Sequence, residues 1–226
     1  MQYRMLQPTT LRFLQQLQRN NNKVWFDAHR KTYEQARADV LALVAAAITE
    51  QAKRDTTIAH LTAKDCLFRI NRDVRFSKNK DPYKTNFGAS ICRGGKKSGL
   101  AGYYIHIEAG ASFIGGGVWM PEPAAVKKIR QEIDYNWDAF QQIIRTAAFK
   151  KAYGNLYTGE DQKLSRLPKP YSADNPAAEY LKLKSFVALR DVSDAELTAQ
   201  TFPKLIATTF AALEPLLHFL NAPLLE

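Results

Sequence analysis

Between residues 66 and 119 the hydrophobic pattern has the period of two that is typical of β-strands, whereas both flanks follow the helical period. Segments 66–76, 87–92, 102–108 and 112–119 predict a meander of four antiparallel strands, and residues 185–190 predict a further edge strand. One helix is expected around residues 11–17 and a second from about residue 23 into the low fifties. More helices are expected after residue 121, and Pro203 and Pro215 should break or kink the last of them.

This order of elements predicts an α+β fold with N-terminal helices, a central, mainly antiparallel sheet and C-terminal helices. The 226 residues, of which 46% are hydrophobic and 11% aromatic, are expected to form a single domain, residues 1–226. No apolar stretch approaches 18 residues and the first ten lack an apolar core, so neither a transmembrane helix nor a signal peptide is expected. Cys66 and Cys92 are too few for a disulfide framework, and a cytoplasmic location is predicted.

Positive charge is concentrated in one part of the chain. The formal net charge is +10, and the segment from Lys64 to Lys97 contains ten Lys and Arg residues against three Asp residues. This segment therefore carries +7 of the total, and the remaining residues share +3. Such a concentration favours an anionic partner, either a nucleic acid or a phosphorylated small molecule.

The densest chemistry lies between Arg69 and Lys84. On an extended strand Arg69, Asp73 and Arg75 would share one face, and the following loop would add lysines and Tyr83. Guanidinium groups suit phosphate oxygens because they donate two parallel hydrogen bonds. The predicted ligand-binding residues are therefore the cations Arg69, Arg72, Arg75, Lys80 and Lys84.

Three residues are candidates for proton transfer. Asp73 lies among the arginines, Tyr83 lies in the loop, and His106 shares a strand face with Glu108 and Tyr104. The four histidines have no metal-type spacing, so a metal site is not expected. The sequence contains no nucleophile elbow and no dinucleotide fingerprint, and it identifies no cofactor.

Three functional interpretations remain open. In the first, the arginine segment binds a nucleotide, a nucleic-acid end or a phosphorylated metabolite, and phosphoester chemistry is the natural reaction class. In the second, the protein is a nucleic-acid-binding module without catalysis, which uses basic charge and aromatic stacking. In the third, the arginines form a structural network with carboxylates, and function lies elsewhere. Whether the chain is an enzyme stays open.

One motif resembles a known family. Arg69-Ile70-Asn71-Arg72-Asp73-Val74-Arg75-Phe76, followed by Asn79-Lys80 and Tyr83, is similar to the signature of the bacterial "domain of unknown function 2461" family of conserved hypothetical proteins. Two other segments resemble the same family, namely residues 21–26 and residues 115–119 before Pro121. The resemblance covers nearly the whole chain and implies no activity, because that family is functionally unassigned.

Overall fold

The computed structural model describes residues 5–159 and 162–226. Its N-terminal elements are α1 (Pro8–Arg19), α2 (Lys23–Ala28), α3 (Arg30–Gln51), a short 3-10 helix (Thr56–Ile58) and α4 (Ala63–Cys66). The strands are β1 (Phe87–Ile91), β2 (Gly102–Ile107), β3 (Ser112–Val118) and β4 (Phe186–Val192). Helices α5 (Pro123–Tyr135), α6 (Trp137–Arg145), α7 (Ala147–Tyr153) and α8 (Ala178–Leu181) lie between β3 and β4, and α9 (Asp194–Thr198) and α10 (Phe202–Leu225) end the chain.

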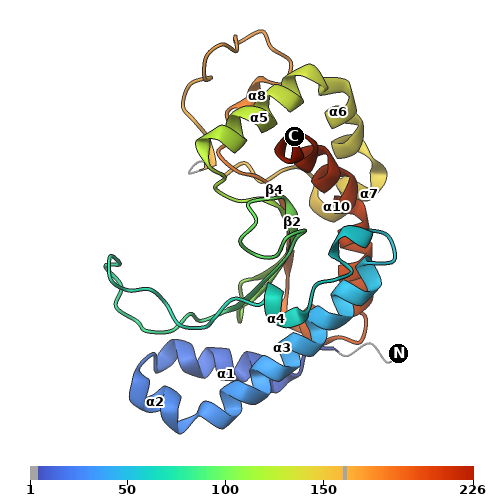
Figure 1. Ribbon diagram of the computed structural model, residues 1–226. Helices are drawn as coiled ribbons and strands as arrows, with labels where there is room; N and C mark the ends of the chain where they lie inside the picture. The colour runs from blue at the N-terminus through green and yellow to red at the C-terminus, as the bar shows by residue number, and fades with distance from the viewer. Residues whose placement is uncertain (1–4, 160–161) are drawn as a thin grey trace.

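The four strands form one antiparallel sheet in the order β1-β2-β3-β4. Strands β1 to β3 are consecutive, whereas β4 joins the edge beside β3 only after helices α5 to α8. Figure 1 shows helices at both ends of the chain flanking this sheet. The predicted α+β class is therefore confirmed.

The two faces of the sheet differ in burial because side chains alternate along each strand. On β2, Tyr103 and Ile105 are buried, whereas Tyr104 and His106 are half-buried. The buried face packs against α3 and α10, and the ring centroids of Tyr103 and Phe210 of α10 lie 4.8 Å apart (Figure 1). The opposite face, which we call the outer face, carries Gly88, Tyr104, His106 and Phe113.

Helix α10 is apolar because it supplies much of the core. Phe202, Phe210, Leu213 and Leu220 are all fully buried. By length and composition alone, α10 is long and apolar enough to span a membrane. Of its most apolar 18-residue stretch, 44% is buried inside the structure. Core helices of soluble proteins meet the same criterion, so α10 carries no separate argument for a membrane.

Two sequence predictions about elements are wrong, and one predicted helix break is absent. Residues 67–76 form no continuous strand, and only Leu67 and Asn71 make isolated bridges there. The predicted helix from residue 23 is divided at His29, whose backbone leaves the helical conformation between α2 and α3. Helix α10 begins at Phe202, with Pro203 in its first turn, and it continues through Pro215, so the helix is not broken at residue 215.

Glycines at 115–117 allow β3 to lie unusually close to its neighbours. A Cβ atom at Gly117, whose φ is +128°, would lie 2.0 Å from the carbonyl oxygen of Phe186 on β4. A Cβ atom at Gly116 would lie 2.1 Å from the carbonyl oxygen of Gly102 and 2.9 Å from the Leu213 side chain. The glycines therefore serve tight packing against the neighbouring strands and α10.

We expect Gly117→Ala to lower the free energy of unfolding by about 3 kcal/mol, because it adds a backbone clash to a strained φ. Gly110→Ala is the matched control, since Gly110 has a φ of +76° but no atom within 4 Å of its Cβ position. Strain alone should make that control cost about 1–2 kcal/mol. Urea unfolding followed by circular dichroism measures both, and equal losses would contradict the close-approach argument.

Candidate functional site

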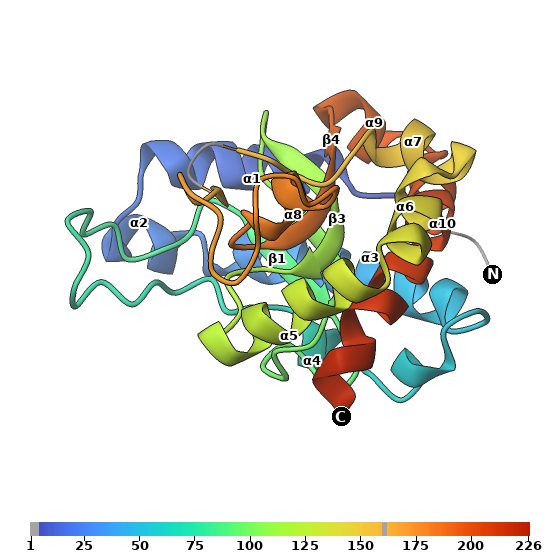
Figure 2. The ribbon, with the colours of Figure 1, turned by 90° about the horizontal axis from the view of Figure 1, so that it is seen from above.

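Residues 69–84 form an irregular hairpin that we call the basic arm. Figures 1 and 2 both show it running out from the sheet, beyond the body of the molecule and beside α2. Its two limbs are joined by hydrogen bonds from the backbone N–H of Arg72 to the Pro82 carbonyl (2.9 Å) and from that of Lys84 to the Ile70 carbonyl (2.8 Å). Pro82 has no N–H to return, which limits the regular ladder and explains why the predicted strand does not form.

The base of the arm is fixed by an asparagine from the turn between α1 and α2. The Asn21 side-chain amide donates to the Tyr83 carbonyl (2.9 Å), and its Oδ1 accepts from the Tyr83 N–H (3.1 Å). The Tyr83 ring stacks on Phe26 with centroids 3.9 Å apart. Two sequence segments that are about sixty residues apart therefore meet here and set the direction in which the arm projects.

At the tip of the arm, cations bond to the arm itself. Arg75 makes two side-chain hydrogen bonds to the Asp73 carboxylate, at 2.9 and 2.6 Å. Arg72 donates to the Asp81 carbonyl and to Ser77 Oγ, both at 3.3 Å, and Lys80 donates to the Val74 carbonyl at 3.1 Å. Arg72 therefore bonds within the arm rather than to a carboxylate elsewhere in the protein.

Two cations at the base of the arm are different. Within the described residues, neither Arg69 nor Lys84 has a carboxylate partner or a side-chain hydrogen bond. The Lys84 ammonium lies 5.4 Å from the centroid of the Phe68 ring. Partial burial, and next the positive charge of Arg69, lower the pKa of Lys84. The structure thus brings together two positive charges that form no ion pair, although the charge of Arg69 also lowers the pKa of the Asp73 carboxyl. An anion would relieve the repulsion between the two cations.

The arrangement around Asp73 and Tyr83 favours structural roles. The hydrogen bonds from Arg75 hold the pKa of the Asp73 carboxyl below its usual range, so this group stays ionised as the partner of Arg75. Tyr83 is only 7% exposed, and burial raises its pKa. Of the three predicted proton-transfer residues, these two are therefore the less suited to exchange protons with a ligand.

His106 lies in a more favourable setting on the outer face. Its Nε2 is 3.1 Å from Glu108 Oε2, and Thr85 Oγ1 donates a hydrogen bond to Glu108 Oε1 at 2.7 Å. Its ring stacks on Phe113 with centroids 4.5 Å apart and planes 6° apart. The stack on Phe113 thus fixes the plane of the ring, and the contact with Glu108 fixes which way the ring is turned in that plane. Sites that position a histidine for proton transfer have the same arrangement.

Sequence reasoning did not identify three residues of this arrangement. Thr85 lies one residue beyond the predicted loop, and its contact with Glu108 depends on the sheet register. Gly88 lies opposite His106, and a Cβ atom there would lie 2.4 Å from the Tyr104 hydroxyl. Asn21 belongs to the segment 21–26 that resembles the family, but no local pattern predicts its partner.

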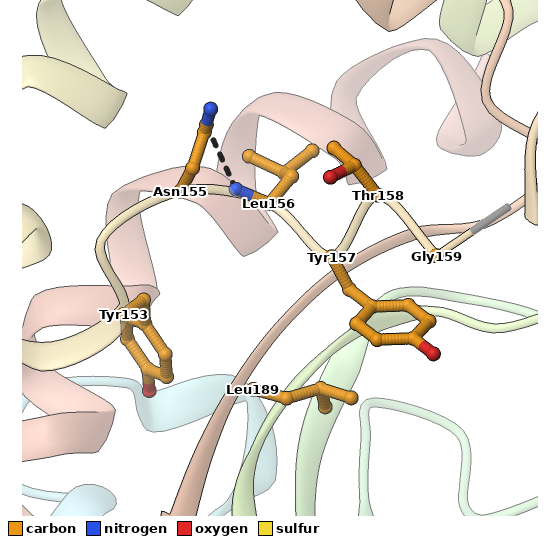
Figure 3. Close-up of a pocket in the computed structure, with 7 residues that line it drawn as sticks. All are labelled: Tyr153, Asn155, Leu156, Tyr157, Thr158, Gly159 and Leu189. Atoms are coloured by element: carbon orange, nitrogen blue, oxygen red, sulfur yellow. Dashed lines mark hydrogen bonds between the residues drawn. The ribbon is translucent and has the colours of Figure 1, made fainter.

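Two hollows lie away from the arm. One has a volume of about 400 Å³ and lies beside β4; Figure 3 shows its lining residues. It is lined by Tyr153, Asn155, Leu156, Tyr157, Thr158, Gly159 and Leu189. The other, of about 240 Å³, lies between α10 and the end of β1 and is bordered by Asp55, Cys92 and Tyr103. Neither contains a predicted ligand-binding residue.

In residues 5–159 and 162–226 no group of three or more His, Cys, Asp or Glu side chains is arranged to hold a metal ion.

Comparison with known proteins gives one match. The family model described as conserved hypothetical protein, DUF2461, matches residues 9–219. No curated protein and no solved structure matches the chain. The matched range contains the basic arm, the Asn21 contact and the outer face.

We expect Asn21→Ala to loosen the arm, because it removes both side-chain hydrogen bonds to the Tyr83 backbone. Two such bonds contribute about 1–3 kcal/mol to the free energy of unfolding. Trypsin should cleave the Lys and Arg sites of the arm several times faster in this variant. Asn20→Ala is the control, since the Asn20 side chain donates only to the Gln16 carbonyl within its own helix. Equal cleavage rates in the two variants would show that Asn21 does not hold the arm.

Proposed function

Since the chain belongs to the DUF2461 family of conserved hypothetical proteins, we propose that the basic arm is a phosphate-binding element of that family and that its ligand is a nucleic acid. The arm has six Lys and Arg residues and two Asp residues between positions 69 and 84. Its net charge is therefore +4, on a segment that projects from the fold. Such a segment can follow a polyanionic backbone.

The observation that carries the proposal is the pair Arg69 and Lys84. Buried cations are normally neutralised by carboxylates or bonded to carbonyl groups. Arg72, Arg75 and Lys80 make such bonds within the arm. The exposed Arg69 and the half-buried Lys84 make none within the described residues, although they lie close enough for Arg69 to lower the pKa of Lys84. Two phosphate oxygens would satisfy both groups.

The shape of the arm supports a nucleic acid over a small ligand. Phe76 at its tip is 96% exposed, and the guanidinium carbon of Arg75 lies 5.8 Å from the centroid of that ring. An exposed aromatic ring among cations suits stacking on an unpaired base. The cations extend along a limb, and neither hollow described above involves them. An extended ligand with repeated phosphates matches this distribution.

A phosphorylated small molecule is the second candidate. It is favoured by the position of Arg69 and Lys84 at the base of the arm, where the Phe68 N–H bonds to the Gly88 carbonyl (2.9 Å) at the β1 edge of the sheet. Such a ligand would depend on the base of the arm and not on its tip. Substitution of Phe76 therefore distinguishes the two candidates.

The structural-network interpretation applies to part of the arm. Asp73 and Arg75 form an ion pair, but both groups are exposed and lie two residues apart. This pair shapes the tip and does not join the sheet to the flanking helices.

A cytoplasmic location belongs to the same proposal and is supported by two free thiols. Both are buried, and burial raises the pKa of Cys66 to about 11.

We expect the protein to bind a fluorescein-labelled, single-stranded 20-mer with an affinity that falls steeply with salt, measured by fluorescence anisotropy between 50 and 200 mM NaCl. Arg69→Ala and Lys84→Ala should each weaken binding by about 5- to 20-fold and reduce the slope of log Kd against log salt by about one. Phe76→Ala should weaken binding with little change of slope, because it removes stacking and leaves the charge.

Lys97→Ala is the matched control, since this exposed lysine belongs to the same basic segment but lies in the turn after β1. It should alter Kd less than twofold. Thermal melting shows that each variant is folded. Equal losses in Lys97→Ala and Lys84→Ala would mean that net charge, and not the arm, determines binding. Binding of inorganic phosphate but not of the oligonucleotide would favour the small-molecule candidate.

A further inference from the structure

We propose that the outer face of the sheet beside the arm is a hydrolytic site, in which His106 acts as the general base on a phosphoester held by Arg69 and Lys84. This inference rests on the proposed function, because it requires a phosphate group at the base of the arm. It adds a reaction and a substrate class to a binding surface. The argument has four parts: the orientation of His106, its rigidity, its access to solvent and its position relative to the cations.

The hydrogen bonds of Glu108 fix which nitrogen of His106 can act. Glu108 is oriented by Thr85 Oγ1 (2.7 Å), and its other oxygen lies 3.1 Å from His106 Nε2. A carboxylate accepts hydrogen bonds, so Nε2 carries the proton in this pair. In the neutral ring, Nδ1 then has a free lone pair. The same logic of a carboxylate that sets the tautomer operates in established acid–base sites.

The site lies on rigid elements. His106 and Phe113 face each other across β2 and β3. Their stacked rings fix the plane of the imidazole, and the contact with Glu108 distinguishes between its two flipped orientations. The backbone of Glu108 is held at both ends by Ser112, whose Oγ accepts from the Glu108 N–H at 2.9 Å and donates to the Glu108 carbonyl at 2.6 Å. When a base is fixed before the substrate binds, little entropy is lost in orienting it during the reaction.

The reactive atoms reach solvent. The His106 side chain is 13% exposed. Within the described residues neither its Nδ1 nor the Tyr104 hydroxyl has a hydrogen-bond partner. The Arg130 Nε is the single fully buried side-chain nitrogen or oxygen there without one. Nδ1 and the Tyr104 hydroxyl are therefore both accessible to water. Burial raises the pKa of Tyr104, so its hydroxyl remains a hydrogen-bond donor at neutral pH.

The cations and the histidine border the same patch. Gly88 lies opposite His106 in the β1–β2 register, and the Phe68 ring packs over the space above Gly88, 3.6 Å from its Cβ position. The Lys84 ammonium lies 5.4 Å from the centroid of the same ring. Lys84 is also followed directly by Thr85, which bonds to Glu108. A phosphate at Lys84 would thus lie beside the patch that His106 faces.

The reaction that fits these groups is hydrolysis of a phosphoester. Water bound at His106 Nδ1 gives a proton to that nitrogen while its oxygen forms a bond to phosphorus. The bond from phosphorus to the leaving oxygen breaks, and the proton held by His106 is returned to that oxygen. Arg69 and Lys84 stabilise the charge on the phosphoryl oxygens. No oxidant or further reactant is required.

The test measures binding and hydrolysis on the same preparations. The probes are bis(p-nitrophenyl) phosphate, p-nitrophenyl phosphate and the labelled 20-mer with a 5′- or 3′-phosphate. We expect the unmodified protein to hydrolyse at least one of them above the buffer rate. His106→Asn should lower kcat by about 100- to 10,000-fold, which is the usual contribution of general acid–base catalysis, while Kd for the 20-mer stays within twofold.

Glu108 and Thr85 are positioning residues, and conservative variants separate that role from a structural one. Thr85→Val removes the hydroxyl that holds Glu108 and should lower kcat by about 10-fold, whereas Thr85→Ser keeps the hydroxyl and should restore the rate. The nitrogen chemical shifts of the His106 ring report the tautomer directly. His60→Asn is the control for loss of an exposed histidine elsewhere.

The outcomes keep the two proposals apart. If the 20-mer binds with the expected dependence on Arg69 and Lys84 but no probe is hydrolysed, the hydrolytic site is overturned and the binding function stands. Hydrolysis that is unchanged in His106→Asn, or equally reduced in His60→Asn, also overturns it. If neither binding nor hydrolysis occurs, both proposals fail. A proton on Nδ1 instead of Nε2 would contradict the assignment of the base.

Discussion

Burial of one face of the sheet beneath α3 and α10 is the constraint on which the other features depend. The alternation along β2 sends Tyr103 and Ile105 into that core, and by the same geometry it places Tyr104 and His106 on the outer face. A shift of register by one residue would exchange these sets, which would bury the histidine and expose the core. The hydrophobic free energy of the core therefore also determines where the polar groups lie.

A second constraint positions the arm. Its limbs have few regular hydrogen bonds of their own, and its tip is held by short-range contacts such as that between Asp73 and Arg75. Its base depends on a side chain, Asn21, that replaces a neighbouring strand by pairing with both backbone groups of Tyr83. Local bonds thus give the arm its form, and one long-range contact gives it a direction. The two cations without carboxylate partners lie at this base, where position is best defined.

The sequence predicts the α+β class and three strands of the meander because alternation and helical periodicity report local burial. It also locates the basic segment. It pairs His106 with Glu108, because side chains two residues apart on a strand point to the same face of the sheet. It fails at residues 67–76, where alternating residues form a limb of the arm. Hydrophobic alternation does not reveal that Pro82 limits the hydrogen-bond ladder between the limbs. The contacts of Asn21 with Tyr83 and of Thr85 with Glu108 are set by tertiary packing, and no local pattern encodes them.

The insertion of α5 to α8 between β3 and β4 has a consequence for synthesis on the ribosome. Strands β1 to β3 are translated well before β4, so the glycine-rich edge of β3 waits for its partner while about seventy further residues are added. At 5–20 residues per second this interval is roughly several seconds. An unpaired edge of that kind invites pairing with other chains. The arm, Asn21 and His106 all precede β4 in the sequence. They are therefore translated before β4 can pair with β3.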